Sequence, residues 1–311
     1  YSSDTQARRD EYGCSQYAGR SGFLECGDGG VNSSLRTNKR RNLNEVWLLS
    51  SVAGALGLFV GSFLNVCSLR WPVDESIVSP GSNCAECRES LHWFDNIPVL
   101  SWVLLRAKCR HCLEPISIQY PLVELTTGLV WAGVFAAHGT SWEALRGGVF
   151  LTILFGISIS DARFYIIPNE FTWGGAALGV ALSVWPGGPT WLSALIGGAV
   201  GYLVLWLVGI IGTIVINKLS PGRLKEAGVD RAMGGGDIKM MMMVGTFLGV
   251  AGVALTTLLG SLLALLVFGP IAAITRRLVP LGVFLAAGGG VTYAWGEPLL
   301  DWYFRLVGID I

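Results

Sequence analysis

Long apolar stretches alternate with short polar segments along most of this chain. A helix needs about 20 apolar residues to cross the hydrocarbon core of a bilayer. Stretches near that length fall at residues 46–69, 120–138, 145–160, 171–187, 190–216, 238–252, 253–275 and 278–296. Their residues do not alternate in polarity, which argues against the strands of a barrel. The pattern predicts an all-α fold: a polytopic membrane protein of about eight transmembrane helices.

The apolar stretch from Ile238 to Thr275 is too long for one crossing. As a single helix it would measure about 57 Å, nearly twice the thickness of a bilayer core. Gly249 and Gly252 lie near its middle. We therefore expect a break there and two shorter helices.

Composition agrees with a membrane protein. Hydrophobic residues make up 52% of the 311 residues, charged residues only 14%, and the chain holds 42 glycines. Glycine is frequent where membrane helices approach closely. The formal net charge is zero. Composition therefore gives no reason to expect a nucleic-acid partner, and the lipid bilayer is the expected surrounding.

Residues 1–45 depart from this pattern, because they are rich in charge and contain no apolar run. We interpret this segment as disordered, or as a translated extension whose true start lies near Leu43 or Val46. A genuine tail is the alternative. It does not resemble a signal peptide, since it lacks an apolar core.

The positions of Lys and Arg predict the orientation in the membrane. Cytoplasmic loops carry an excess of these residues. If residues 70–119 lie in the cytoplasm, that side collects most of the basic residues after position 45, and the opposite side keeps Arg146 and Arg305. This orientation places Asp161 and Asp237 on the cytoplasmic side.

Two Cys-x-x-Cys pairs lie in segment 70–119: Cys84 with Cys87, and Cys109 with Cys112. Each pair offers two thiolates from one tight turn, and two such turns complete a tetrahedral zinc site. We predict a structural Zn²⁺ here. The alternative is a redox or disulfide pair, which a reducing cytoplasm disfavours. His111 is interpreted as a bystander between two ligands.

Two aspartates stand where apolar stretches meet charged loops. Asp161 follows the run that ends at Ser160, and Asp237 follows Gly234–Gly236. A carboxylate at membrane depth is costly unless it faces protein or water, so it often marks function. Taken singly, each has a simpler explanation. Asp237 would cap the helix that follows it, and Asp161 would be an interfacial residue near Arg163.

Several motifs occur in a fixed order over most of residues 55–250. They are Gly61–Val66, Ser79–Pro80, the two cysteine pairs, Asp95–Trp102, Tyr120–Glu124, Asp161 with Ile167–Pro168, and Met233–Lys239. This order resembles the type IV prepilin peptidases, which are bacterial membrane aspartic proteases of the GxGD class.

The resemblance implies that Asp161 and Asp237 are the catalytic pair, which holds one water and attacks an amide. Gly234, Gly236 and Lys239 belong to the motif around Asp237, where the glycines would let an extended peptide approach. The implied substrates are prepilins and pseudopilins of type IV pili and type II secretion. The implied location is the bacterial inner membrane, with the active site at its cytoplasmic face.

The family has a second activity, in which S-adenosylmethionine methylates the new N-terminus. Glu124 is a candidate to contact the basic leader or the new amine, and a plain acid near a helix N-terminus is the alternative. Two residues depart from the family pattern. Asn169 replaces a common Asp, and Ala107 replaces a common Gly in the cysteine loop. Because of Ala107, a peptidase without methyl transfer remains an alternative.

The resemblance divides the chain into four parts. Residues 1–45 are the extension, 46–69 the first transmembrane helix, 70–119 the cytoplasmic zinc loop, and 120–311 the transmembrane protease core. A non-catalytic transporter with a cation or proton site at the two aspartates is the remaining alternative. Internal repeats would favour it, and the sequence shows no clear repeat between its halves.

Overall fold

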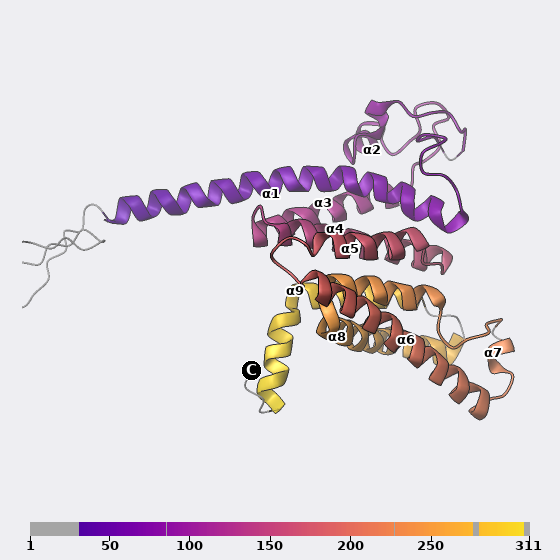
Figure 1. Cartoon of the computed structure of the whole chain (residues 1–311). Coiled ribbons are helices and arrows are strands. Elements are labelled where there is room, and N and C mark those ends of the chain that lie inside the picture. The colour runs from indigo at the N-terminus through magenta and orange to yellow at the C-terminus, as the bar shows by residue number, and fades with distance from the viewer. Residues whose placement is uncertain (1–30, 85, 227, 276–279, 308–311) are drawn as a thin grey trace, which may run out of the picture. The chain divides into compact units, whose positions relative to one another are not determined.

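The computed structural model describes the backbone of residues 31–84, 86–226, 228–275 and 280–307 (Figure 1). Side chains are described from residue 44 onward, except at 85, 223, 226, 227, 269–279 and 307–311. By its contacts the chain divides into two units, Tyr1–Leu48 and Leu49–Ile311. The first unit holds the start of α1 from Val31. The core and the candidate site belong to the second unit.

The described residues are helical, which agrees with the predicted all-α class. The long helices are α1 (Val31–Arg70), α3 (Gln119–His138), α4 (Trp142–Phe164), α6 (Trp191–Leu219), α8 (Gly235–Thr275) and α9 (Leu281–Val307). The shorter ones are η1 (Trp71–Val73), η2 (Trp93–Asn96), α2 (Leu100–Leu104), η3 (Glu170–Gly174), α5 (Gly175–Leu182) and α7 (Arg223–Glu226). Two isolated bridges lie in the cysteine loop.

Five helices in the described residues are long and apolar enough to cross a membrane. They cover Asn44–Val73, Gln119–His138, Trp142–Phe164, Trp191–Leu219 and Gly235–Phe268. The predicted stretch 171–187 forms a shorter helix, η3 followed by α5, which ends at Leu182. Pro186 and Pro189 follow closely, and proline cannot continue a helix interior. The predicted first helix, 46–69, lies inside a longer one, because α1 is helical from Val31.

The expected break in the last long apolar stretch is confirmed at Gly249. Its φ of 69° and ψ of −171° interrupt α8, so Gly235–Thr275 consists of two helical parts. A side chain is strained at this positive φ, and glycine adopts it freely. The kink also brings the Gly249 backbone against Gly197 of α6.

Helices α6 and α8 pack backbone to backbone through small residues. A Cβ atom added at Gly201 of α6 would collide with the carbonyl oxygen of Met241, and one added at Gly245 of α8 would collide with Gly197. Glycine allows this close approach between membrane helices. The contact fixes the first half of α8, which carries Asp237.

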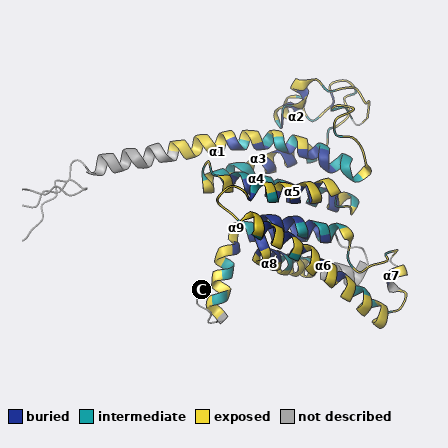
Figure 2. Cartoon of the chain, viewed as in Figure 1, coloured by how far each residue is buried: buried dark blue, intermediate teal, exposed yellow. Residues whose placement is uncertain are grey.

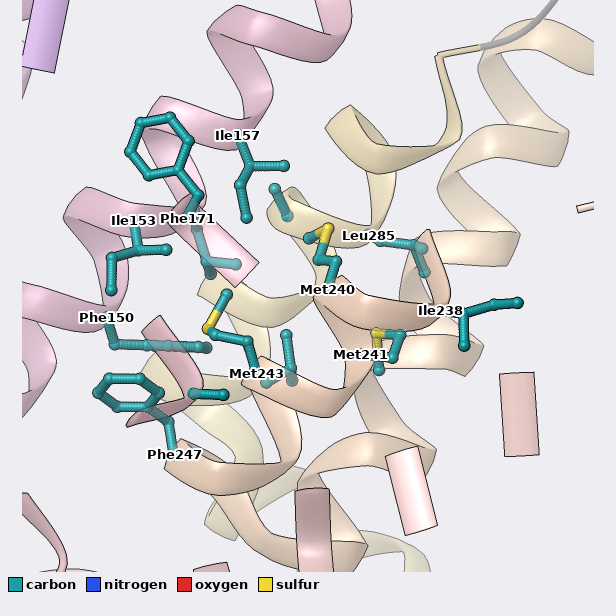
Figure 3. Close-up of a cluster of buried hydrophobic side chains, with 14 of the residues drawn as sticks. Phe150, Ile153, Ile157, Phe171, Ile238, Met240, Met241, Met243, Phe247 and Leu285 are labelled. Atoms are coloured by element: carbon teal, nitrogen blue, oxygen red, sulfur yellow. The ribbon is translucent and has the colours of Figure 1, made fainter. Parts of the chain in front are cut away.

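The core lies between α4, α8 and α9 (Figure 2). Met240, Met241 and Met243 of α8 are fully buried. Around them lie Phe150, Ile153 and Ile157 of α4, Phe171 of η3 and Leu285 of α9 (Figure 3). Methionine fills irregular gaps because its side chain is unbranched and flexible. These contacts hold together the three helix ends that form the candidate site.

Candidate functional site

Asp161 lies in the last turn of α4. Helix α4 starts at Ser141, whose hydroxyl accepts a hydrogen bond from the N–H of Ala144 at 3.1 Å. It ends at Tyr165, whose left-handed φ of 55° lets its N–H donate back to the Asp161 carbonyl at 3.0 Å. Asp161 is 6% exposed. Its Oδ2 atom accepts a hydrogen bond of 3.1 Å from the backbone N–H of Val283 in α9.

Asp237 lies in the first turn of α8 and is half-buried. The glycines before it provide space, since none of the three has a positive φ. A Cβ atom at Gly234 would lie 3.0 Å from Asp237 Oδ2, and one at Gly236 would lie 2.9 Å from the Cβ of Ile167. Close approach to neighbouring side chains therefore explains Gly234 and Gly236 better than an unusual backbone angle does.

The structure brings the surroundings of the two aspartates together around Ile167. A Cβ atom at Gly282 of α9 would lie 2.8 Å from Ile167 Cδ1 and 2.9 Å from Asp161 Oδ2. Ile167 therefore contacts Gly236 beside Asp237 and also Gly282 beside Asp161. The ends of α4, α8 and α9 thus form one acidic site.

Lys239 anchors the start of α8 to the start of η3. Its Nζ donates a hydrogen bond of 2.8 Å to Asn169 Oδ1. Asn169, which departs from the family pattern, is therefore the hydrogen-bond partner of Lys239 in the motif around Asp237. Sequence reasoning missed this pairing, because 69 residues separate the two positions.

Glu124 lies beyond the first turn of α3 and is only 7% exposed. Its Oε2 atom accepts a hydrogen bond of 2.7 Å from the N–H of Val99. Val99 has a φ of 61°, so the carboxylate holds a strained turn of the cysteine loop. An ordinary acid near a helix start would be exposed, whereas Glu124 is buried and binds the backbone of the cysteine loop.

The four cysteines of the loop form one cluster. The Sγ atoms of Cys84, Cys87, Cys109 and Cys112 all lie within 4.8 Å of one another. Cys84 and Cys112 are 3.8 Å apart at sulfur, and all four thiols are free. Four sulfurs around Zn²⁺ at about 2.3 Å would be about 3.8 Å apart. The donor set and its spacing therefore fit a tetrahedral metal site, and they do not fit a disulfide.

The two halves of this cluster have the same backbone. The N–H of Cys84 donates to the Glu89 carbonyl, and the N–H of Cys109 donates to the Glu114 carbonyl. In each half the residue four positions after the first cysteine, Arg88 or Leu113, has a φ near +60° and donates back to that cysteine. This short-range repeat was not recognised in the sequence.

Backbone N–H groups make Cys109 a ready thiolate. Those of Cys112 and His111 point at its sulfur and lower the pKa of the thiol to about 6. The His111 N–H lies 3.4 Å from that sulfur. His111 thus acts through its backbone, which agrees with its interpretation as a bystander to the ligand set.

An ion pair ties the second half of the cluster to η2. Arg110 Nη2 lies 2.5 Å from Asp95 Oδ1, and its Nε contacts both carboxylate oxygens. The Asp95 side chain is 3% exposed, and the guanidinium lies 5.4 Å from the ring centre of Phe94. The hydrogen bond from Arg110 lowers the pKa of Asp95. Sequence reasoning had placed Asp95 in a motif without giving it a role.

A cavity of about 520 Å³ separates the cysteine loop from the start of α3 and the end of α1. Its lining includes Arg70, Asp95, Trp102, Arg110, Tyr120 and Glu124. Arg70 is held in place by the carbonyl oxygens of Ser76, Pro80 and Gly81. The cavity has the size of a small-molecule site and offers acidic, basic and aromatic groups.

Two family models match the chain. Residues 55–138 match the Bacterial Peptidase A24 N-terminal domain. Residues 148–269 match the Type IV leader peptidase family. The first match holds the four cysteines, and the second holds both aspartates. No solved structure matches the chain.

Curated relatives carry the name prepilin leader peptidase/N-methyltransferase. One from Myxococcus xanthus is 39% identical over 62% of this chain, and the match spans 54% of that relative. One from Xanthomonas campestris is 32% identical over 83% of this chain and 95% of the relative. One from Neisseria gonorrhoeae is 33% identical over 78% of this chain and 86% of the relative. This chain therefore belongs to the type IV prepilin leader peptidase/N-methyltransferase family.

Proposed function

We propose that this protein is a membrane aspartic endopeptidase that removes the leader peptides of type IV prepilins and pseudopilins. The observation that supports the proposal is the position of Ile167, which contacts both Gly236 beside Asp237 and Gly282 beside Asp161. The names of the curated relatives support the same activity. By that resemblance, methyl transfer to the new N-terminus follows cleavage.

The two carboxyl groups would share one proton, since two adjacent charges repel each other. The ionised member takes a proton from a water molecule. The neutral member protonates the scissile carbonyl oxygen while the water oxygen attacks the carbonyl carbon. The tetrahedral intermediate collapses when the leaving amine receives a proton. The reaction consumes one water molecule and gives a carboxylic acid on the leader and a free amine on the pilin.

The site would face the cytoplasm of a bacterial cell, at the inner membrane. The excess of Lys and Arg in segment 70–119 and in the later loops on that side supports this orientation. Prepilins carry a basic leader before a hydrophobic helix, so their cleavage point lies at that boundary. We also propose that α9 and both parts of α8 cross the membrane, in keeping with about eight crossings.

The four-cysteine cluster would hold Zn²⁺ in a structural role. The four thiolates fill a tetrahedral coordination sphere. The ion would join the two turns of a loop that has little regular structure. It would supply this cross-link and no reaction chemistry, since four protein ligands leave no position for a substrate.

The cavity above α3 would receive S-adenosylmethionine and the new N-terminus. Its volume of about 520 Å³ suits a nucleoside-sized molecule. The donor would supply the methyl group. Trp102 and Tyr120 offer aromatic surface for a cation or a base, and Glu124 offers a carboxylate that attracts an ammonium group. Ala107 does not weaken this assignment. Its φ of 59° is a conformation that glycine adopts easily, so the loop keeps the same backbone with alanine in place of the common glycine.

The test is cleavage of a purified prepilin in detergent or vesicles. Asp161→Asn and Asp237→Asn should each abolish leader removal while the protein still accumulates in the membrane. Asp301→Asn, at an exposed position of α9, is the matched control and should cleave normally. Near-normal cleavage by either of the first two variants would rule out the proposed pair. Mass spectrometry of the product separates cleavage alone from cleavage with one added methyl group.

A further inference from the structure

The start of α9 contacts Asp161, although it lies outside the region that the family models match. The second model ends at residue 269, and α9 covers Leu281–Val307. Neither motif around the aspartates includes this helix. The structure nevertheless places its first turn against the Asp161 side chain.

One contact is a hydrogen bond from the helix backbone. The N–H of Val283 is among the first amides of α9, which have no partner within the helix itself. It donates to Asp161 Oδ2 at 3.1 Å. A hydrogen bond from an amide to an ionised carboxylate is stronger than one between neutral groups. This bond fixes the orientation of the carboxylate relative to the start of α9.

The second contact is steric. Gly282 is buried, and any Cβ there would lie 2.9 Å from Asp161 Oδ2 and 3.1 Å from its carboxyl carbon. The same Cβ would lie 2.8 Å from Ile167 Cδ1. A side chain at position 282 must therefore displace the carboxylate or Ile167. Gly290, in the same helix, has only Leu151 Cδ2 at 3.8 Å and leaves room for a methyl group.

We propose that the first turn of α9 is a positioning element of the catalytic site. The amide of Val283 and the absence of a side chain at Gly282 together orient the Asp161 carboxylate for its part in the reaction. This inference rests on the proposed function of Asp161. It adds a third helix to a site that the motifs assign to α4 and α8.

The first experiment removes the amide. Val283→Pro deletes the N–H, and proline is tolerated in the first turn of a helix. Val283→Ala changes the side chain and keeps the N–H. We expect kcat for prepilin cleavage to be about ten- to a hundredfold lower in the proline variant than in the alanine variant, with KM within about twofold. If the proline variant were instead partly unfolded, the fraction of enzyme able to bind substrate would fall. Titration with purified prepilin measures that fraction.

The second experiment covers the case in which the proline variant does not fold. Gly282→Ala should lower kcat about tenfold or more with little change in KM, because the methyl group displaces the carboxylate. Gly290→Ala, which adds the same methyl group to the same helix, should match the wild type. The inference is overturned if Gly282→Ala and Val283→Pro both keep the wild-type kcat. It fails together with the proposed function if the wild-type enzyme cleaves no prepilin; if the wild type cleaves, only the inference is at stake.

Discussion

Lys239 and Asn169 join two turns of the candidate site through a hydrogen bond of 2.8 Å. Lys239 follows Asp237 by two residues, and Asn169 precedes η3, which packs on α8. The bond therefore fixes the first turn of α8 relative to the loop that carries Ile167. The partner of Lys239 is the neutral side-chain amide of Asn169.

This pairing predicts a mild effect of charge at position 169. Asn169→Asp keeps an acceptor for Lys239 and turns the contact into a largely exposed ion pair, which is worth about 0–1 kcal/mol. We expect activity within about twofold of the wild type. Asn169→Ala removes the acceptor and should lower activity more than Asn169→Asp does. Equal rates for the two variants in a prepilin cleavage assay would show that the bond does not support the site.

Ala107 predicts a stabilising substitution. Its φ of 59° lies in the left-handed region, where a residue with a Cβ is strained by about 1–2 kcal/mol. Glycine removes that strain, although its greater freedom in the unfolded chain offsets about 0.5–1 kcal/mol of the gain. Ala107→Gly should therefore stabilise the loop by about 0.5–1 kcal/mol. Hydrogen exchange of the loop amides measures this. Faster exchange in the variant would contradict it.

The cysteine cluster predicts a bound metal with a structural effect. The purified protein should contain about one Zn²⁺ per chain, and a strong chelator should expose the loop to proteolysis. Cys84→Ser and Cys109→Ser should each lower the zinc content. Cys67→Ala is the control, because Cys67 is buried within α1 away from the cluster. Unchanged zinc in both serine variants would disprove the site.

The ion pair of Asp95 predicts a pH dependence. Because Arg110 lowers the pKa of Asp95 in the folded loop, the pair stabilises the loop above the ordinary aspartate pKa of 3.8. That stabilisation is lost as the pH falls through the lower folded pKa. Asp95→Asn should therefore be less stable than the wild type at neutral pH, and the difference should vanish in strong acid. If the stability difference between Asp95→Asn and the wild type does not change with pH, the substitution acts through packing and not through the ion pair.

Gly201 predicts that contact between α6 and α8 is required for stability. A Cβ at this position collides with the Met241 backbone, which cannot yield as a flexible side chain can. Gly201→Ala should lower the thermal stability in detergent by the equivalent of about 1–3 kcal/mol. Gly174→Ala, where a Cβ meets nothing within 4 Å, is the control. Equal melting temperatures for the two variants would contradict the packing argument.

Local features of the fold could be predicted from the sequence because their causes are local. The spacing of the cysteine pairs predicted the cluster, and the length of the apolar stretch predicted the interruption at Gly249. The helix after Pro168 was predicted too long, because apolar character continues past Leu182 while the backbone stops before Pro186. Apolar runs indicate segments long enough to cross a membrane, and they indicate helix ends only where a turn residue is recognised.

Long-range features of the site could not be predicted in this way. Nothing near Asp161 in the sequence indicates Val283, and nothing near Lys239 indicates Asn169. The approach of Asp161 to Asp237 was expected only from a family resemblance. Such contacts depend on how α4, α8 and α9 pack, and that packing depends on glycines and methionines whose partners are distant in the sequence.

The matching backbones of the two cysteine turns have a consequence for symmetry. Since each turn presents its pair of sulfurs through the same hydrogen bonds, an ion bound between them would lie close to a local dyad. The two turns would then be equivalent halves of one clamp. Loss of the metal ligands in one turn should also free the other turn from the ion. The two turns should therefore unfold together in one cooperative step.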